Sequence, residues 1–347
     1  MRYFTRNQPG MQVGEWHALA LCVLALTGYA NAATPDPMPF EVIPQQRQLF
    51  LDDHGVADIH RLRHTMHSPV KRGAVIRPDQ PWETSLQTRC MPAWDEKEQV
   101  FKIWMITSTP TPEYGGTTYA ESKDGIHWTK PILNQREYPE TQGSRKNNFL
   151  SFETNLMENA VYDPDDPDPN RRFKGFFGAL GRRPAASSNG INWKKLDVKM
   201  ITSGDESNMS YDRHSRLFIV TLKEGGPFGR AHMLSTSKDF ETWTTPTLIF
   251  HADELDQELG AAWIKARLSN TKLQQPGSND PDYYNVDVYN FGVFRYESIY
   301  VGLPAMFHST GPSPNRTNTD GFHLVQLACS RNLHDWNRLG NRQPFIG

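Results

Sequence analysis

Ser122-Lys-Asp-Gly-Ile-His-Trp128 is the first of four segments that decide the fold of this 347-residue chain. The other three are Ser187-Ser-Asn-Gly-Ile-Asn-Trp193, Ser237-Lys-Asp-Phe-Glu-Thr-Trp243 and Ser330-Arg-Asn-Leu-His-Asp-Trp336. All four align without a gap, with Ser first, Asp or Asn third and Trp seventh, which indicates a structural repeat. Asp and Asn cap turns and tolerate the left-handed conformation, so each copy predicts a turn followed by a Trp that packs back on the sheet.

Two strand-like stretches precede each copy, separated by a hairpin-type turn. The first stretches span residues 88–94, 156–162, 208–211 and 286–294, and the second span 101–106, 173–177, 217–222 and 298–303. The unit is therefore strand, turn, strand, loop and signature strand, which is typical of a four-stranded antiparallel blade. Repeated blades predict an all-β protein whose body is a β-propeller.

The repeat is compatible with two different numbers of blades. The four Trp residues are 65, 50 and 93 residues apart, which indicates loops of very different length. Either the propeller has four blades, or it is a five-bladed propeller whose fifth blade is truncated or partly supplied by the segment before Glu83. We expect the five-bladed form. The expected organisation is a signal peptide over 1–32, an N-terminal segment over 33–80 that packs on the propeller, and the propeller over 81–347.

The N-terminus has the pattern of a cleaved export signal. Arg2 and Arg6 precede an apolar run over 18–26, and Ala30-Asn-Ala32 places small residues at both recognition positions. The run is shorter than the roughly 20 residues that span a bilayer. We therefore expect cleavage after Ala32, a secreted or periplasmic protein, and no membrane attachment after cleavage.

Composition narrows the class of partner. The 37 Lys and Arg residues nearly balance 39 Asp and Glu, so no basic surface for nucleic acid is indicated. Nine Trp residues suit a turn-rich β-protein that stacks on sugars. We expect a carbohydrate partner, a monomer and no cofactor, since no metal-ligand spacing, phosphate loop or Gly-x-Ser-x-Gly elbow is present. Cys90 and Cys329 either pair or remain two buried thiols, and we expect the thiols.

Segments upstream of the repeats carry a family resemblance. These are Leu49-Phe-Leu-Asp-Asp53, His64-Thr-Met-His-Ser-Pro69 and Pro81-Trp-Glu83. With the repeats, they resemble bacterial proteins that are themselves similar to glycoside hydrolase family 32, within the five-bladed arabinanase, levansucrase and invertase class. The resemblance covers residues 45–347 and implies a central funnel, lined by the innermost strand of each blade, in which carboxylates cleave a glycosidic bond. The chain lacks the three carboxylate motifs of invertases, so the resemblance assigns no catalytic role to a residue.

Polar side chains at the expected starts of the innermost strands are the candidate site. The catalytic candidates are Asp205, Glu206, Glu83 and Asp287, and the candidates for substrate binding are Arg89, Asn155, Glu158, Tyr289 and His232.

Asp205 and Glu206 are the strongest catalytic pair. Neighbouring residues of a strand point to opposite faces, so we expect one of the two to face the funnel. A crowded carboxyl group has a raised pKa and suits a general acid, whereas Lys223 or Arg230 would hold one ionised. By the same alternation, Asp287 and Tyr289 share a face, which places a carboxylate beside a ring that could stack on a sugar.

Each candidate also has a structural alternative. Glu83 is otherwise a loop acid beside a packing Trp, Glu158 a surface acid, and Tyr289 a ring packed between blades. His232 and His308 are more often structural when they stand alone. The acids of residues 163–168 suit a solvated turn better than a calcium site.

Three functions are compatible with these patterns. The leading hypothesis is a secreted glycoside hydrolase that acts on a plant or algal type of poly- or oligosaccharide. The alternative is a carbohydrate-binding or scaffold propeller without turnover, which predicts that the funnel lacks two carboxylates within about 10 Å of each other. A sialidase-like enzyme is less favoured, because its repeat usually carries one more residue between Ser and Trp and no cluster of three arginines is apparent.

Overall fold

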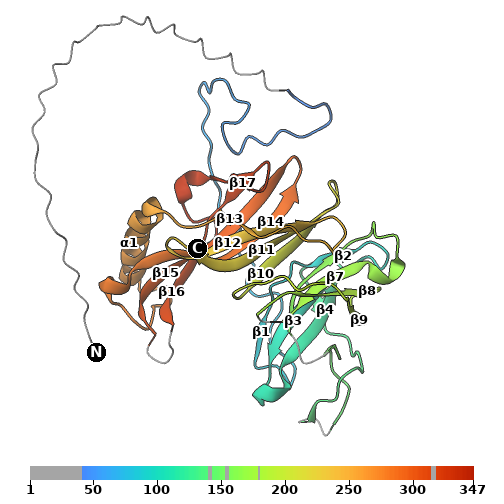
Figure 1. Cartoon of the computed structure of the whole chain (residues 1–347). Coiled ribbons are helices and arrows are strands. Elements are labelled where there is room, and N and C mark those ends of the chain that lie inside the picture. Colours follow the sequence, from blue (N-terminus) through green and yellow to red (C-terminus); the bar gives the residue numbers. More distant parts are fainter. Residues whose placement is uncertain (1–40, 140–142, 153–155, 179, 314–317) are drawn as a thin grey trace, which may run out of the picture. The chain divides into compact units, whose positions relative to one another are not determined.

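Each copy of the repeat lies in its own antiparallel sheet, and we call these sheets blades 1 to 4 in chain order (Figure 1). The computed structural model describes residues 41–139, 143–152, 156–178, 180–313 and 318–347. The predicted all-β propeller of antiparallel blades is confirmed, with four blades and a single α-helix in the described part of the chain. The expected signal peptide, residues 1–32, lies outside the described residues.

The strands follow one another outward in blades 2 and 3, whereas β1 and β2 both pair with β3 in blade 1, and β16 and β17 both pair with β15 in blade 4. Blade 1 contains β1 (Ser85–Gln87), β2 (Ala93–Asp95), β3 (Val100–Ser108), β4 (Gly116–Ser122) and β5 (Trp128–Thr129). Blade 2 contains β6 (Met157–Tyr162), β7 (Phe173–Phe177), β8 (Arg183–Ser187) and β9 (Trp193–Lys195). Blade 3 contains β10 (Ser207–Asp212), β11 (Leu217–Gly226), β12 (Gly229–Ser237) and β13 (Thr247–Phe250). Blade 4 contains β14 (Asn285–Tyr296), β15 (Ile299–Pro312), β16 (Thr319–Val325), β17 (Ala328–Ser330) and β18 (Asn337–Arg338).

The inner strands of the four blades are β2, β6, β10 and β14. β2 contacts β6, β6 contacts β10, and β10 contacts β14, so the inner strands of successive blades lie beside one another. Buried apolar side chains form a core between each pair of consecutive blades. Between blades 1 and 2, for example, Trp104 packs edge-on against Phe173 and Trp193. This packing brings the starts of the inner strands together.

Residues 41–84 contain no strand. Within residues 41–84 no part of a fifth blade is present, and a fifth blade stays a prediction. Leu49 and Leu51 instead pack on an apolar cluster of blade 4, and the Asp52 carboxylate accepts 2.8 Å bonds from both terminal nitrogens of Arg331. This arginine holds the pKa of Asp52 well below its usual range.

The signature turn has the same hydrogen bonds in all four copies. In the third copy, Ser237 Oγ accepts from the Phe240 amide at 2.9 Å, and Asp239 Oδ1 accepts from the next two amides at 2.8 and 2.7 Å. The Trp243 indole donates to the carbonyl of Phe240. The left-handed residue is the fourth, with φ of 64° at Phe240, and not the third as the sequence suggested. The fourth residues of the copies are Gly125, Gly190, Phe240 and Leu333.

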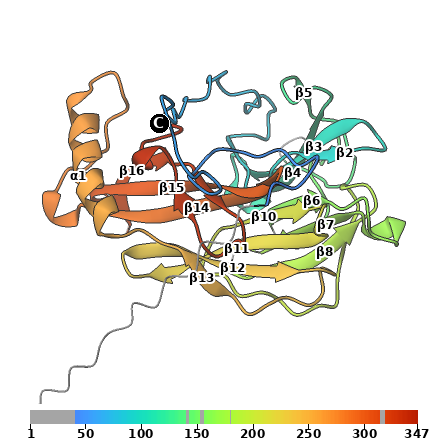
Figure 2. The same ribbon diagram turned by 90° about the horizontal axis from the view of Figure 1, so that it is seen from above.

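The long spacing before the last copy is due to two added segments: α1 (Glu254–Ser269), which precedes β14, and β16, which lies between β15 and β17. Asp253 and Asp256 form a reciprocal capping box at the start of α1, and Figures 1 and 2 show the helix beside β14 and β15. The 3-10 helices that lie within the described residues are η1 (Pro112–Tyr114), η3 (Pro169–Arg171), η4 (Pro281–Tyr283) and η5 (Gly340–Arg342). No helix in the described ranges is long and apolar enough to span a bilayer.

Cys90 and Cys329 are both buried and unpaired, which confirms the prediction of two thiols. Burial raises the pKa of Cys90 to about 12 and that of Cys329 to about 11. Neither thiol is therefore a reactive thiolate at neutral pH.

Candidate functional site

The starts of the inner strands meet at the Glu206 carboxylate. Glu206 lies just before β10 of blade 3, and its Oε1 pairs with Arg89 of blade 1 at 2.8 Å. Its Oε2 accepts a 2.7 Å hydrogen bond from Asn290 of blade 4. Arg89 also donates to Glu158 of blade 2, at 2.5 Å to Oε2. Side chains from all four blades therefore form one polar cluster, which we call the funnel cluster.

Asp205 and Glu206 share one ammonium group. Lys223 Nζ on β11 lies 3.0 Å from Asp205 Oδ2 and 3.3 Å from Glu206 Oε2. The expectation that the two acids point to opposite faces is wrong, because both precede β10 and are not subject to strand alternation. Their exposure differs: 52% of the Asp205 side chain is exposed, against 5% for Glu206. Asp205 is thus the carboxylate that an incoming ligand can contact.

Glu158 lies fully inside the funnel cluster and not on the surface. The ladder between β6 and β7 shifts register between Met157 and Asn159, so Glu158 occupies a bulge. Burial raises the pKa of Glu158, while the bond from Arg89 and the charge of Arg182 counteract this rise. Arg182 is itself completely buried, and burial lowers its pKa. Because Glu158 has no exposed surface, its expected contact with substrate is wrong, and it instead holds the arginines in place.

Asp287 and Tyr289 flank the guanidinium group of Arg230. Arg230 on β12 donates from Nε to Asp287 Oδ2 at 2.8 Å, and its guanidinium carbon lies 4.8 Å from the centre of the Tyr289 ring. Lys223 Nζ lies 3.7 Å from the centre of the same ring. The ring is therefore covered by two cations, which provide cation–π contacts.

A second bulge, in β14, changes the face of the sheet to which the following side chains point. The register with β15 shifts between Val288 and Asn290, so Tyr289 is the extra residue. In a regular strand, Asn290 would point away from the face of Tyr289. Here both contact the funnel cluster, Tyr289 through Lys223 and Asn290 through Glu206. Bulges of this kind occur beside functional sites, where they redirect a side chain.

His232 and His308 do not reach the funnel surface. The His232 side chain has no exposed surface and packs near Phe291, so its predicted contact with substrate is wrong. His308 stacks on Phe322 in the core beside α1. Both are structural histidines, as the alternative interpretation held.

Glu83 belongs to a different cluster. Its Oε2 pairs with Lys130 at 2.6 Å and accepts from the Asp79 amide at 3.0 Å, and its side chain is buried. These contacts stabilise the turn before β1, so the prediction that Glu83 lies in the funnel with Asp205 is wrong. Asn155 lies outside the described residues.

The acids of residues 163–168 surround an ammonium group. Lys174 Nζ lies 2.8 Å from Asp163 and 2.7 Å from Asp166, and the Lys174 side chain is buried. The interpretation of these acids as solvated is therefore wrong for Asp163, which is buried too. Among the described residues, no group of three or more His, Cys, Asp and Glu side chains is arranged to hold a metal ion.

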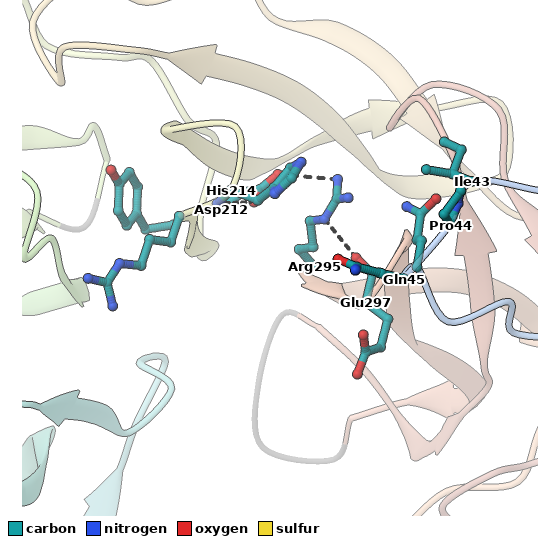
Figure 3. Close-up of a pocket in the computed structure, with 10 residues that line it drawn as sticks. Ile43, Pro44, Gln45, Asp212, His214, Arg295 and Glu297 are labelled. Carbon is teal, nitrogen blue, oxygen red and sulfur yellow. Dashed lines mark hydrogen bonds and ion pairs between the residues drawn. The ribbon is translucent and has the colours of Figure 1, made fainter.

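A separate cavity of about 650 Å³ lies at the other end of the inner strands. Figure 3 shows Arg295, near the end of β14, between Asp212 and Glu297. Its Nη1 lies 3.6 Å from Asp212 Oδ2, and its Nε donates to the Glu297 carbonyl at 2.9 Å. None of the candidate site residues lines this cavity.

Formal charges cancel within the funnel cluster. Its carboxylates are Glu158, Asp205, Glu206 and Asp287, and its cations are Arg89, Arg182, Lys223 and Arg230. Asp205 is half exposed, and Asp287 has one oxygen, Oδ1, without a hydrogen-bond partner in the described part of the chain. All four carboxylates pair with cations, and Asp205 is the one whose side chain is exposed, whereas Asp287, Glu206 and Glu158 are buried.

Arg182 and Asn290 were missed at the sequence level. Arg182 lies just before β8, the third strand of blade 2, whereas the sequence prediction was limited to the starts of the inner strands. Asn290 follows Tyr289, so regular alternation places it on the opposite face, and the bulge that redirects it leaves no clear sequence signal. Lys223 and Arg230 were expected to hold a carboxylate ionised, and both make such contacts.

Comparisons with known proteins give distant structural likenesses and no match in sequence. No family model matches the chain, and no curated protein sequence matches it. An N-acetylgalactosamine deacetylase from F. plautii is similar in structure, with 12% identity, 80% of this chain and 74% of that chain covered, and a TM-score of 0.43.

Two glycoside hydrolases show a comparable likeness. A thermostable family-43 glycoside hydrolase has 13% identity, 75% and 74% coverage of this chain and of that chain, and a TM-score of 0.41. A β-fructofuranosidase from Schwanniomyces occidentalis has 10% identity and a TM-score of 0.44, with 77% of this chain but 47% of that chain covered. Similarity at this level assigns no function to the chain.

Proposed function

We propose that this protein is a glycoside hydrolase that acts on a poly- or oligosaccharide in the central funnel. The observation that carries the proposal is the convergence of carboxylates from different blades around Lys223, Arg230 and Tyr289. Asp205 and Glu206 both contact one ammonium, at 3.0 and 3.3 Å, so their oxygens lie closer than the sum of these distances. This separation is well inside about 10 Å, which the alternative without turnover did not predict.

Asp205 is the carboxylate proposed to act on the substrate. Glycoside cleavage needs one carboxyl group that donates a proton and a second carboxylate that acts as a base or nucleophile. Asp205 is exposed and lies 3.0 Å from the Lys223 ammonium, so it is proposed as the base or nucleophile. Asp287, whose buried Oδ1 has no hydrogen-bond partner among the described residues, is proposed as the second carboxyl group. Glu206 positions Lys223 and Arg89.

Measured turnover tests this assignment. We expect Asp205→Asn to lower the rate of reducing-end release from the cleaved glycan by about 10²-fold or more, because acid–base groups contribute that much. The thermal midpoint should hardly change, because the side chain is half exposed. Glu241→Gln is the matched control, since Glu241 is an acid of similar exposure (48%) that pairs with Arg171 away from the funnel. Unchanged activity after replacing Asp205 and Glu206 together would remove the proposed site.

Carbohydrate binding without turnover is the second candidate. It is favoured by the charge balance of the funnel cluster, in which cations contact all four carboxylates. This function predicts saturable binding of a glycan to the wild-type protein with no cleavage product. Calorimetry and product analysis on the same samples distinguish the two functions.

We also propose that the protein is exported and acts as a monomer, related to the bacterial group similar to glycoside hydrolase family 32. Export is supported by the small residues at positions 30 and 32 after a short apolar run. Mass spectrometry of the protein recovered outside the cytoplasm should give Ala33 as the first residue. An intact residue 1 in that fraction would contradict cleavage.

A further inference from the structure

Arg230 differs from the other three cations of the funnel cluster. The side chains of Arg89, Arg182 and Lys223 are 16%, 0% and 4% exposed, and their charged ends contact the acids inside the cluster. The Arg230 side chain is 32% exposed. Among the described residues, Arg230 is thus the funnel cation that an incoming ligand can best contact.

The guanidinium group of Arg230 is held in place from two sides. Its Nε donates to Asp287, and its carbon Cζ lies 4.8 Å from the Tyr289 ring centre and 4.6 Å from the Phe307 ring centre. The terminal nitrogens Nη1 and Nη2 donate to no described residue. A fixed guanidinium with two free parallel donors matches the two oxygens of a carboxylate.

Arg230 and the exposed Asp205 lie around the same ring. Lys223, which pairs with Asp205 at 3.0 Å, is 3.7 Å from the centre of Tyr289, and Arg230 lies 4.8 Å from that centre. The His323 ring packs edge-on against Tyr289 at 4.7 Å and closes the other side of this surface. Burial and the charge of Arg230 lower the pKa of His323, so the imidazole adds no positive charge here at neutral pH.

We propose that the funnel binds an acidic saccharide, a glycan that contains uronic acid, and that Arg230 receives the sugar carboxylate through Nη1 and Nη2. This inference rests on the proposed function, in that it takes the funnel to be a carbohydrate site. Bound in this way, the uronate ring lies against the exposed Arg230 guanidinium group, and its glycosidic bond is directed towards Asp205. A neutral sugar leaves the two guanidinium donors without an anionic partner, so it binds more weakly.

The test compares uronic-acid oligosaccharides with their own methyl esters, which keep the sugar and linkage but remove the charge. The panel consists of oligogalacturonates and oligoglucuronates of four residues, and binding is measured by calorimetry at fixed ionic strength. We expect the wild-type protein to bind one of the acids at least about tenfold more tightly than its ester, because the bidentate pair is lost in the ester. Equal binding of acid and ester, or no binding of either, overturns the inference.

Two variants locate this preference. Arg230→Lys keeps the charge but removes the fork, and Arg230→Gln removes both, so each should lose about tenfold in affinity for the acid and leave the ester unchanged. Arg171→Gln is the control, since Arg171 is a partly exposed arginine that pairs with Glu241 outside the funnel. An acid preference that persists in Arg230→Gln overturns the inference. A shared loss of acid and ester binding does so too, because Arg230 would then serve only to hold Asp287.

Product analysis of the same mixtures separates this inference from the proposed function. If the acid binds through Arg230 and no bond is cleaved, the inference stands and hydrolysis fails. If neutral glycans are cleaved at a rate that does not depend on Arg230, hydrolysis stands and the inference fails.

Discussion

Two histidines in the interior show how burial outweighs the chemistry that a residue type suggests. Burial lowers the pKa of His232 to about 3 and that of His308 to about 4, and for His232 the charge of Lys223 adds to this effect. Both rings are therefore neutral at physiological pH. In the unfolded chain, each histidine has an ordinary pKa near 6.5.

These pKa values make stability depend on pH. Below pH 6.5 the unfolded state takes up protons that the folded state does not, so the free energy of unfolding falls as the pH is lowered towards 4. We expect each histidine to account for about 3 kcal/mol over this range, at about 1.4 kcal/mol per pKa unit. Urea unfolding between pH 7 and 4.5 measures the slope.

The variant His232→Gln should reduce that slope, and His334→Gln, at an exposed position, should not. An equal slope in wild type and His232→Gln would show that other groups cause the pH dependence. Aspartates whose pKa is lowered, such as Asp253 with a pKa of about 2, act in a more acidic range.

The sequence predicted the residue types of the funnel cluster better than their roles. Asp205, Glu206, Asp287 and Arg89 were nominated because they precede or begin inner strands, and the structure brings them together. The solvent exposure of these side chains could not be predicted from the sequence, because it depends on how neighbouring blades pack against them. This explains why the sequence could not recognise His232 as a buried side chain.

At the scale of elements, the signature turn shows which of its residues can be exchanged. Two copies have Asp at the third position and two have Asn, and in each copy one side-chain oxygen accepts from the same two backbone amides. The charge is therefore not essential to the turn, whereas the acceptor is.

A pair of substitutions in blade 3 tests this statement. We expect Asp239→Ala to lower the free energy of unfolding by about 1–2 kcal/mol, since two amides lose their acceptor, as at a helix N-cap. Asp239→Asn, the residue that copies 2 and 4 contain, should change stability by no more than about 0.5 kcal/mol. Chemical denaturation of both variants is the measurement, and equal loss in the two would mean that the charge itself matters.

Bulges explain most of what the sequence could not give at this scale. The repeat fixed the blades and the register of the signature turn, because its spacing is constant in all copies. The bulges at Glu158 and Tyr289 break the alternation on which the facing of inner strands was predicted. The left-handed position was also misplaced, because Phe240 and Leu333 adopt it although they are not glycine.

At the scale of the whole molecule, lysines link each of the first two blades to the next. Lys102 bonds Asp95 in blade 1 and the Asn189 carbonyl in blade 2, and it lies 5.0 Å from the ring centre of Phe173. Lys174 in blade 2 lies 5.4 Å from the ring centre of Phe218 in blade 3. The corresponding contact between blades 3 and 4 joins Asp212 to the Tyr300 hydroxyl at 2.9 Å.

Removal of one of these ammonium groups should destabilise the entire propeller. We expect Lys174→Met to lower the free energy of unfolding by about 3–5 kcal/mol, because it leaves the buried Asp163 without its counter-charge. Lys194→Met on the exposed outer strand of the same blade is the control and should have little effect. Denaturant titrations followed by tryptophan fluorescence provide both values. A loss below about 1 kcal/mol in Lys174→Met would contradict the structural role.

Blade 2 contains both partners of the contact between a lysine and an aromatic ring. The two partners are neighbouring residues whose side chains point to opposite faces of the sheet. Phe173 receives the ammonium of blade 1, and Lys174 is directed to the ring of blade 3. A copy of blade 2 placed directly after itself would meet a matching partner on both sides. Blade 2 is therefore the unit of this chain that gene duplication or engineering can multiply with the fewest changes, which offers a direct route from four blades to a larger ring.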